Sequence, residues 1–201
     1  MDSDNPFGAD NQQETEPPAW HLDPMWITGF VDGEGCFSVS IHRNPQAKLT
    51  QGWQVQACFQ VTQHQSSRHV LDALRGYFGC GRVVSKGPQS NVLTFTVWAL
   101  RDLDEIIVPF FESHDLVVKR ADFLRFASIV RSMRLKEHLS PRGFERVVRL
   151  AYAMNAHGKQ RARSLDEILS GSSETARQAS LHATKVQSDP HGDMGSQAEM
   201  I

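Results

Sequence analysis

The chain has 201 residues and a mass of 22.6 kDa, and its hydrophobic content of 40% is enough for one compact domain with tails. No apolar run approaches the ~18 residues of a membrane span, and the first 23 residues are acidic rather than basic and apolar. Three cysteines without a CxxC pair argue against a disulfide framework. We therefore expect an intracellular protein of a reducing compartment that is not secreted and has no membrane partner.

The net charge of −2 hides three segments of different sign. Residues 1–23 carry six acids and no Lys or Arg, residues 166–201 carry six acids and two bases, and residues 24–165 carry 19 bases and 11 acids. The basic middle predicts affinity for polyanions such as nucleic acids, although a charge run alone is also typical of a solvated face.

Both ends of the chain have little to bury. The stretch 5–18 is rich in Asn, Gln, Glu and Pro, and the stretch after residue 170 is rich in Gly and Ser. Such composition is typical of disorder. We therefore expect disordered acidic tails over 1–19 and 169–201, which flank a single folded domain over 20–168.

The first predicted elements of the domain are a helix and two strands. Asp23 is a typical N-cap, Pro24 fits the first helical position, and the glycines within 33–35 predict the end of the helix. Segments 36–42 and 53–62 alternate apolar and polar residues, which predicts two half-buried strands joined as a hairpin.

The remaining predicted elements are a helix, two strands and further helices. Segment 67–78 predicts a helix, and segments 81–85 and 91–98 predict strands around the turn at 86–88. The later helices are predicted at 102–111, at 119–134, and from the cap Ser140 and Pro141 to about residue 155. This order predicts an α+β fold in which a four-stranded antiparallel sheet carries helices on one face.

The other face of this predicted sheet is polar. Gln can bond adenine through two hydrogen bonds, Ser and Thr adapt to several base edges, and a twisted β-ribbon fits the major groove of DNA. Basic residues at the strand ends, with almost no acids nearby, also favour DNA over the alternative of an ordinary solvent face. The polar residues on this face are Ser40, His42, Gln54, Gln56, Gln60, Thr94 and Thr96, and the basic neighbours are Arg43, Lys48, Arg68, Arg82 and Lys86.

The motif with the most distinctive chemistry is Gly-Phe-Val-Asp-Gly-Glu-Gly at 29–35, where the first helix ends. Carboxylates at the carboxyl end of a helix each cost ~0.3–1 kcal/mol unless a cation offsets them. Asp32 and Glu34 with backbone carbonyls form a hard oxygen site that suits Mg²⁺, which also takes phosphate and water as ligands. The alternative is a glycine-terminated helix with solvated acids.

Gly29 and Gly33 are four residues apart, so they lie on one face of the first helix. Small residues there let a second helix approach closely, and one such helix per chain predicts a homodimer with Gly29, Phe30 and Gly33 at its interface. Two identical helices would bring both Glu34 carboxylates near a twofold axis, which a pseudo-palindromic duplex can match.

The end of the first helix resembles a known signature. Residues 27–35, Ile-Thr-Gly-Phe-Val-Asp-Gly-Glu-Gly, resemble the nine-residue motif of the LAGLIDADG homing endonucleases. Gly29, Asp32 and Gly35 match that motif. Glu34 replaces its last Asp with the same functional group.

The likeness extends beyond the motif. Phe-Gln-Val-Thr-Gln at 59–63, the order of the elements and Lys119 at the start of a helix resemble the single-motif, homodimeric subgroup found in large-subunit ribosomal RNA introns. The resemblance covers about residues 20–168 and implies the αββαββα fold and saddle-shaped sheet of that family. It also implies a location in a bacterial cytoplasm or in an organelle, such as a chloroplast or mitochondrion.

The resemblance implies roles for several residues of the motif and its surroundings. Glu34 would bind the metal ion, Mg²⁺ or Mn²⁺, together with the backbone carbonyl of Gly33, and Asp32 would help to close the helix end. Gln63 would order water in the active site, and Lys119 would lie beside the scissile phosphate.

The resemblance also implies DNA contacts along the open face and at its ends. A basic loop near the C-terminus would touch the DNA backbone near the cut, and it comprises Lys159, Arg161 and Arg163. The other expected DNA contacts are Ser40, His42, Arg43, Asn44, Gln54, Gln56, Gln60, Arg68 and Lys86.

We therefore expect a site-specific homing endonuclease that, as a homodimer, makes a Mg²⁺-dependent double-strand break in a long pseudo-palindromic target and promotes intron homing. Its partners would be double-stranded DNA and a second copy of itself. One alternative is a non-cleaving protein on the same scaffold, either an intron-splicing maturase with intron RNA as its partner or a DNA-binding protein. A second alternative is a plain α+β protein-interaction domain.

Overall fold

The computed structural model describes residues 22–47, 52–154 and 163–170, and it confirms the predicted αββαββα order. The first six elements are α1 (Pro24–Glu34), β1 (Gly35–Arg43), β2 (Trp53–His64), α2 (Arg68–Phe78), β3 (Arg82–Ser85) and β4 (Val92–Val97). They are followed by α3 (Leu100–Asp102), the π-helical turn η3 (Leu103–Ile107), α4 (Val108–Ser113), α5 (Arg120–Arg134) and α6 (Pro141–Ala153). The short 3-10 helices η2 (Gln65–Ser67) and η4 (Glu137–Leu139) precede α2 and α6. None of the helices in these described stretches is long and apolar enough to cross a membrane.

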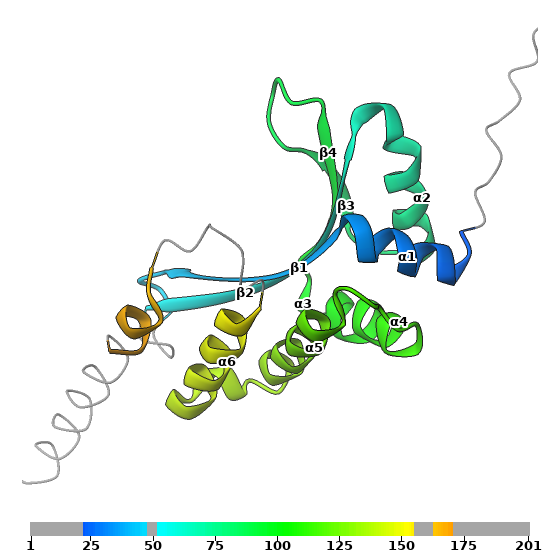
Figure 1. The fold of residues 1–201 in the computed structure, drawn as a ribbon. Helices are drawn as coiled ribbons and strands as arrows, with labels where there is room; N and C mark the ends of the chain where they lie inside the picture. Colours follow the sequence, from blue (N-terminus) through cyan, green and yellow to red (C-terminus); the bar gives the residue numbers. More distant parts are fainter. Residues whose placement is uncertain (1–21, 48–51, 155–162, 171–201) are drawn as a thin grey trace, which may run out of the picture.

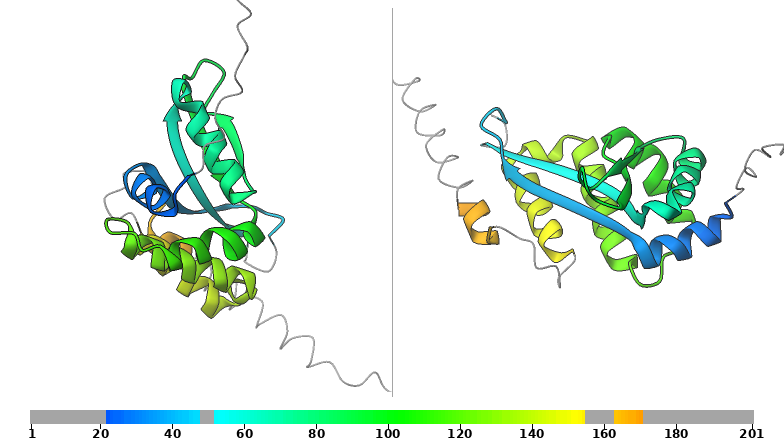
Figure 2. Two further views of the ribbon diagram at one scale, coloured as in Figure 1. Left: turned by 90° about the vertical axis from the view of Figure 1, so that its right-hand side faces the viewer. Right: turned by 90° about the horizontal axis from the view of Figure 1, so that it is seen from above.

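The four strands form one antiparallel sheet in the order β1-β2-β4-β3. Gly35 pairs with Val61 and Arg43 pairs with Trp53, so β2 accompanies β1 along its whole length. The sheet is strongly bent, the helices lie on its convex side, and its concave side is open (Figure 1). Seen from above in Figure 2, β1 and β2 pass over α5 and α6, so the open side faces the viewer.

The convex side of the sheet holds the core because each strand turns alternate residues toward the helices. Phe37 of β1 and Phe59 of β2 face each other with ring centroids 5.2 Å apart, and both rings also contact Phe111 of α4. Phe126 of α5 packs on Phe37 at 5.3 Å. All four rings are at most 2% exposed, and full burial of one such side chain contributes about 2 kcal/mol.

The helix α1 begins and ends where the sequence predicts. The Asp23 carboxylate accepts hydrogen bonds from the backbone N–H groups of Met25 at 2.7 Å and Trp26 at 3.2 Å, as an N-cap does. At the other end a Cβ on Gly35 would lie 2.6 Å from the Val31 side chain and 2.7 Å from its carbonyl oxygen. The chain therefore needs glycine there because the strand leaves the helix at close range.

The helix predicted at 102–111 differs from what the structure contains. The helical stretch begins at Leu100 and passes through the π-helical turn η3, in which the N–H of Val108 donates to the carbonyl of Leu103. Pro109 has no N–H for the carbonyl four residues earlier, and a wider turn before it accommodates that missing bond.

The last described segment is helical and reaches residue 170. Residues 165–170 are helical, Ile168 is buried, and the Tyr152 hydroxyl donates to the carbonyl of Arg163 at 2.7 Å. Residues 169 and 170, which we expected in the tail, therefore belong to this helix. The expected tails over 1–19 and from residue 171 onward lie outside the described residues.

Candidate functional site

The junction between α1 and β1 is tied to the start of α5 by the carboxylate of Asp32. This carboxylate accepts hydrogen bonds from the backbone N–H groups of Val117 and Val118 at 2.9 Å and of Lys119 at 2.8 Å. Burial raises the pKa of Asp32, but the three backbone donors and the charge of Lys119 together lower it by more. The pKa of Asp32 therefore lies below its usual value. Asp32 thus fixes the chain that enters α5, which has no side-chain cap of its own.

Lys119 reaches back to the same junction from α5. Its ammonium donates to the backbone carbonyl of Asp32 and, at 3.0 Å, to the carbonyl of Gly33. The last turn of α1 contains no basic residue, so Lys119 supplies the positive charge that favours a helix carboxyl end. Glu34, the next residue, is exposed.

Gln63 lies at the same end of the sheet as Glu34. Gly35 pairs with Val61, and β2 continues past that pair, so Gln63 stands beside the point where α1 enters β1. Its side chain is half-buried. Lys119 thus contacts the α1–β1 junction that holds Glu34, and Gln63 lies on the neighbouring strand at the same end of the sheet; the resemblance implied active-site roles for all three.

The oxygen atoms at this junction can supply some, but not all, of the ligands of a metal ion. Among the described residues, no group of three or more His, Cys, Asp or Glu side chains is placed to hold a metal ion. The Glu34 carboxylate and the Gly33 carbonyl are hard oxygen ligands. These donors fit a divalent ion such as Mg²⁺, which commonly keeps several waters and takes further ligands from substrate phosphates.

The open face of the sheet carries the predicted base-contacting residues. Ser40, His42 and Gln54 are exposed, and Gln56 and Gln60 are half-buried. Cross-strand pairing places Ser40 opposite Gln56 and His42 opposite Gln54. The hairpin residue Asn44 donates from its side-chain amide to the Gln54 side-chain carbonyl at 2.7 Å. This bond orients the Gln54 amide at the outer end of the face.

Two other polar residues of this face are less available than the sequence suggested. Thr94 and Thr96 are 6% and 2% exposed, because β4 lies between β2 and β3 and its short side chains are covered by their neighbours. The Thr94 hydroxyl lies 3.3 Å from that of Thr62, and the Thr96 hydroxyl lies 3.3 Å from the Cys58 sulfur. Their hydroxyls therefore bond within the sheet rather than project from it.

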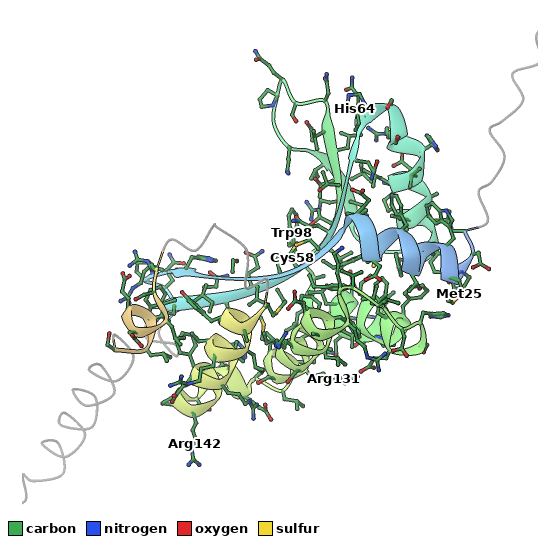
Figure 3. The ribbon with its side chains drawn as sticks, in the orientation of Figure 1. Met25, Cys58, His64, Trp98, Arg131 and Arg142 are labelled. Carbon is green, nitrogen blue, oxygen red and sulfur yellow. The ribbon has the colours of Figure 1, made fainter. Side chains whose placement is uncertain are left out.

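The centre of the open face contains a tryptophan that the sequence analysis did not single out. Trp98 is 43% exposed and lies beside Cys58 in the bend of the sheet (Figure 3). The Arg82 guanidinium stands 5.5 Å from the centre of its ring. The alternation in 91–98 already places Trp98 on the face of the two threonines, so this signal was present in the sequence.

Two of the basic residues predicted to contact DNA lie at the hairpin end of the sheet. Arg43 and Arg163 both stand over the ring of buried Trp53, at 4.0 and 5.5 Å from its centre. Trp53 pairs with the last residue of β1, so this cluster lies at the opposite end of the nine-residue strand from Glu34, ~27 Å along it. Arg163 is therefore not beside the junction where we expected the cut, because its contacts with Trp53 and Tyr152 hold it at the outer end of the hairpin.

The remaining predicted cations are on the surface or outside the described residues. Arg68 begins α2, and its guanidinium is 3.1 Å from the carboxylate of Asp72. Lys86 is exposed in the turn between β3 and β4. Lys159 and Arg161 lie in 155–162, which the structure does not describe.

One side of α1 is apolar, and its side chains are exposed in the described part of the chain. Met25 is 65% exposed and Trp26 is 44% exposed, and the ring of Trp26 stacks on that of Phe30 with centroids 4.8 Å apart. A Cβ added to Gly29 or Gly33 would meet nothing within 4 Å. The surface continues into the loop before α5, where Val117 and Val118 are 84% and 80% exposed.

The sequence matches known proteins over most of the described fold. The sequence model for LAGLIDADG endonuclease matches residues 27–130. Homing endonuclease I-ApeII of Aeropyrum pernix is 32% identical over 148 residues, which are 72% of this chain and 86% of that protein. Probable intron-encoded endonuclease 2 of Neurospora crassa is 34% identical over 135 residues, which are 67% of this chain but 29% of the relative. The chain thus spans less than a third of the length of this relative and of two other fungal relatives that it matches.

Two solved structures share the fold over nearly their whole length. The homing endonuclease I-TnaI has a TM-score of 0.66 and 37% identity, covering 74% of this chain and 97% of that chain. The archaeal intron-encoded homing endonuclease I-Vdi141I, solved in complex with DNA, has a TM-score of 0.69 and 30% identity, covering 75% and 94%. This chain, with its motif at the α1–β1 junction and its open antiparallel sheet, belongs to the LAGLIDADG endonuclease family.

Proposed function

We propose that this chain is a site-specific homing endonuclease that makes a double-strand break in a long pseudo-palindromic DNA target and so promotes intron homing. This proposal rests on the exposed Glu34 carboxylate, which lies next to the Gly33 carbonyl and the Lys119 ammonium. These groups lie at the α1–β1 junction, where the open polar face of the sheet begins. A protein that only binds nucleic acid has no need of an exposed carboxylate where phosphates would pass, because it repels them.

LAGLIDADG endonucleases generally use divalent metal ions. In this chain Glu34 and Gly33 would hold the ion, and Mg²⁺ or Mn²⁺ suits their oxygen atoms. A bound ion lowers the pKa of a coordinated water and offsets charge on the phosphate. Gln63 then has the role of orienting water through its amide, and Lys119 that of contacting the phosphate next to the cut.

The exposed side of α1 supports a homodimer of the single-motif type. Gly29 and Gly33 leave room for a second helix, while Trp26 and Phe30 present apolar area that is costly to leave in water. A twofold contact along α1 would bring two Glu34 side chains close together. Each carboxylate would then serve one strand of the duplex, which accounts for a cut in both strands.

The concave face supports recognition of a long target. Polar side chains line it from the junction to the hairpin tip, and cross-strand pairs such as His42 and Gln54 can each contact a base edge in the major groove. Arg43, Lys86 and Arg163 lie at its margins and would contact the phosphate backbone, with Lys159 and Arg161 as further expected contacts. Such contacts position the protein without reading sequence. We place the protein in the intracellular compartment that holds its target DNA.

The proposal is tested by incubating the purified protein with Mg²⁺ and a DNA pool that includes intronless large-subunit ribosomal RNA genes. We expect a double-strand cut at one site, and none in EDTA. Absence of cutting together with tight and specific binding of intron RNA would instead identify a splicing maturase. Absence of cutting together with no salt-dependent DNA binding would identify a protein-interaction domain.

A further inference from the structure

The Lys119 ammonium forms a hydrogen bond with the Gly33 carbonyl oxygen, which is also a ligand of the proposed metal ion. It donates to the Gly33 carbonyl at 3.0 Å and to the Asp32 carbonyl. Both carbonyls belong to the last turn of α1, where backbone oxygens lack helical donors. In the structure, therefore, a protein cation already satisfies the end of this helix.

The charges around the junction explain why a cation is held there. The carboxyl end of α1 carries partial negative charge, and Asp32 and Glu34 add two carboxylates to it. Asp32 is satisfied by three backbone N–H groups, whereas Glu34 is exposed. The last turn of α1 contains no basic residue, and in the described part of the chain Lys119 supplies a positive charge at this helix end.

We propose that Lys119 is a built-in counter-cation that a divalent ion displaces from the Gly33 carbonyl, so that this lysine sets how tightly the DNA-free protein holds the ion. The proposal rests on the proposed function, in which Gly33 and Glu34 hold that ion. A displaced ammonium loses the Gly33 carbonyl as a partner and becomes available to donate to a phosphate oxygen. Premature metal binding without DNA is thereby disfavoured.

The loop that carries Lys119 is also held by bonds that do not involve its side chain. Asp32 holds this loop through backbone N–H groups of Val117, Val118 and Lys119, which every substitution at 119 other than proline preserves. Variants at this position are therefore expected to fold. Lys119→Gln also keeps a side-chain donor while it removes the charge, and it serves if Lys119→Met is unstable.

The test measures Mn²⁺ binding to the DNA-free protein from the electron paramagnetic resonance signal of unbound Mn²⁺. We expect Lys119→Met and Lys119→Gln to bind Mn²⁺ about five- to tenfold more tightly than the native chain, because a competing charge is gone. Lys119→Arg, which keeps the charge, should stay close to the native affinity. Lys136→Met removes the same charge at an exposed position before η4 and should change nothing.

Two further measurements locate the effect and separate it from cutting. Glu34→Gln added to Lys119→Met should remove the gain in affinity, and Mg²⁺ should raise the Tm of Lys119→Met more than that of the native chain. Unchanged or weaker Mn²⁺ binding in both neutral variants would contradict the proposal that Lys119 is a counter-cation, even if the native protein cuts DNA. Tighter Mn²⁺ binding by the variants of a protein that cuts no DNA would support the counter-cation role of Lys119. The same result would contradict the proposed endonuclease function.

Discussion

Asp32 and Lys119 hold each other at two points: the Asp32 carboxylate accepts the backbone N–H of Lys119 at 2.8 Å, and the Lys119 ammonium donates to the Asp32 carbonyl. This reciprocal contact joins the carboxyl end of α1 to the start of α5. Because Gly33 and Glu34 follow Asp32 directly, the contact also fixes the donors of the proposed metal site.

Replacing Asp32 by Asn should destabilise the fold by about 0.5–2 kcal/mol, since an amide offers one acceptor oxygen where the carboxylate serves three N–H groups. The folded pKa of Asp32 lies below its ordinary value of 3.8, so its contribution is present above that pH and disappears as the pH falls through the lowered pKa. Urea unfolding of both proteins checks this. A difference in unfolding free energy that does not shrink between about pH 5 and pH 2 would contradict it.

Placing leucine at Gly29 should weaken self-association by about tenfold or more, because the added side chain fills the space that a second α1 needs. Gly76→Leu is the matched control, since Gly76 lies in α2 and a Cβ there also meets nothing within 4 Å. Both changes should stabilise the monomer by ~0.5–1 kcal/mol through helix propensity. Sedimentation equilibrium measures the association. Equal dimer affinity in the two variants would show that Gly29 does not lie in the dimer interface.

The boundaries of most elements were predictable because their signals are local. Asp23 with Pro24 and Ser140 with Pro141 mark two helix starts, and in the structure both side chains bond the backbone N–H groups of the first turn. The alternation in β1 and β2 gave the correct faces. The π-helical turn η3 was not predicted, since it depends on how Pro109 is accommodated within a packed helix rather than on a repeating pattern.

The contacts of the site were less predictable because they join distant segments. Nothing in the sequence shows that Lys119 bonds the Gly33 carbonyl, or that Arg163 stands over Trp53 at the far end of the hairpin. The burial of Thr94 and Thr96 follows from the central place of β4 in the sheet, which periodicity alone does not reveal.

Replacing Gln54 by Ala should cost ~1–3 kcal/mol of binding to the preferred base and relax specificity at one position of the target. The Gln54 carbonyl is already bonded to Asn44, which leaves its NH₂ group directed by that bond. Lys86→Ala should instead weaken binding to all sequences alike and reduce the slope of log K against log salt by ~1. Filter binding on single-base target variants across a salt series measures both. The same loss for every target with Gln54→Ala would show that this residue reads no base.

The most direct test compares cutting and binding by the native chain and by Glu34→Gln on one DNA target in Mg²⁺. Glu145→Gln, which neutralises an exposed carboxylate of α6, is the matched control. We expect Glu34→Gln to lose at least ~100-fold in the rate of double-strand cutting while its DNA affinity is kept, and Glu145→Gln to cut normally. Cutting by Glu34→Gln at a rate near that of the native chain would show that Glu34 does not hold the metal ion.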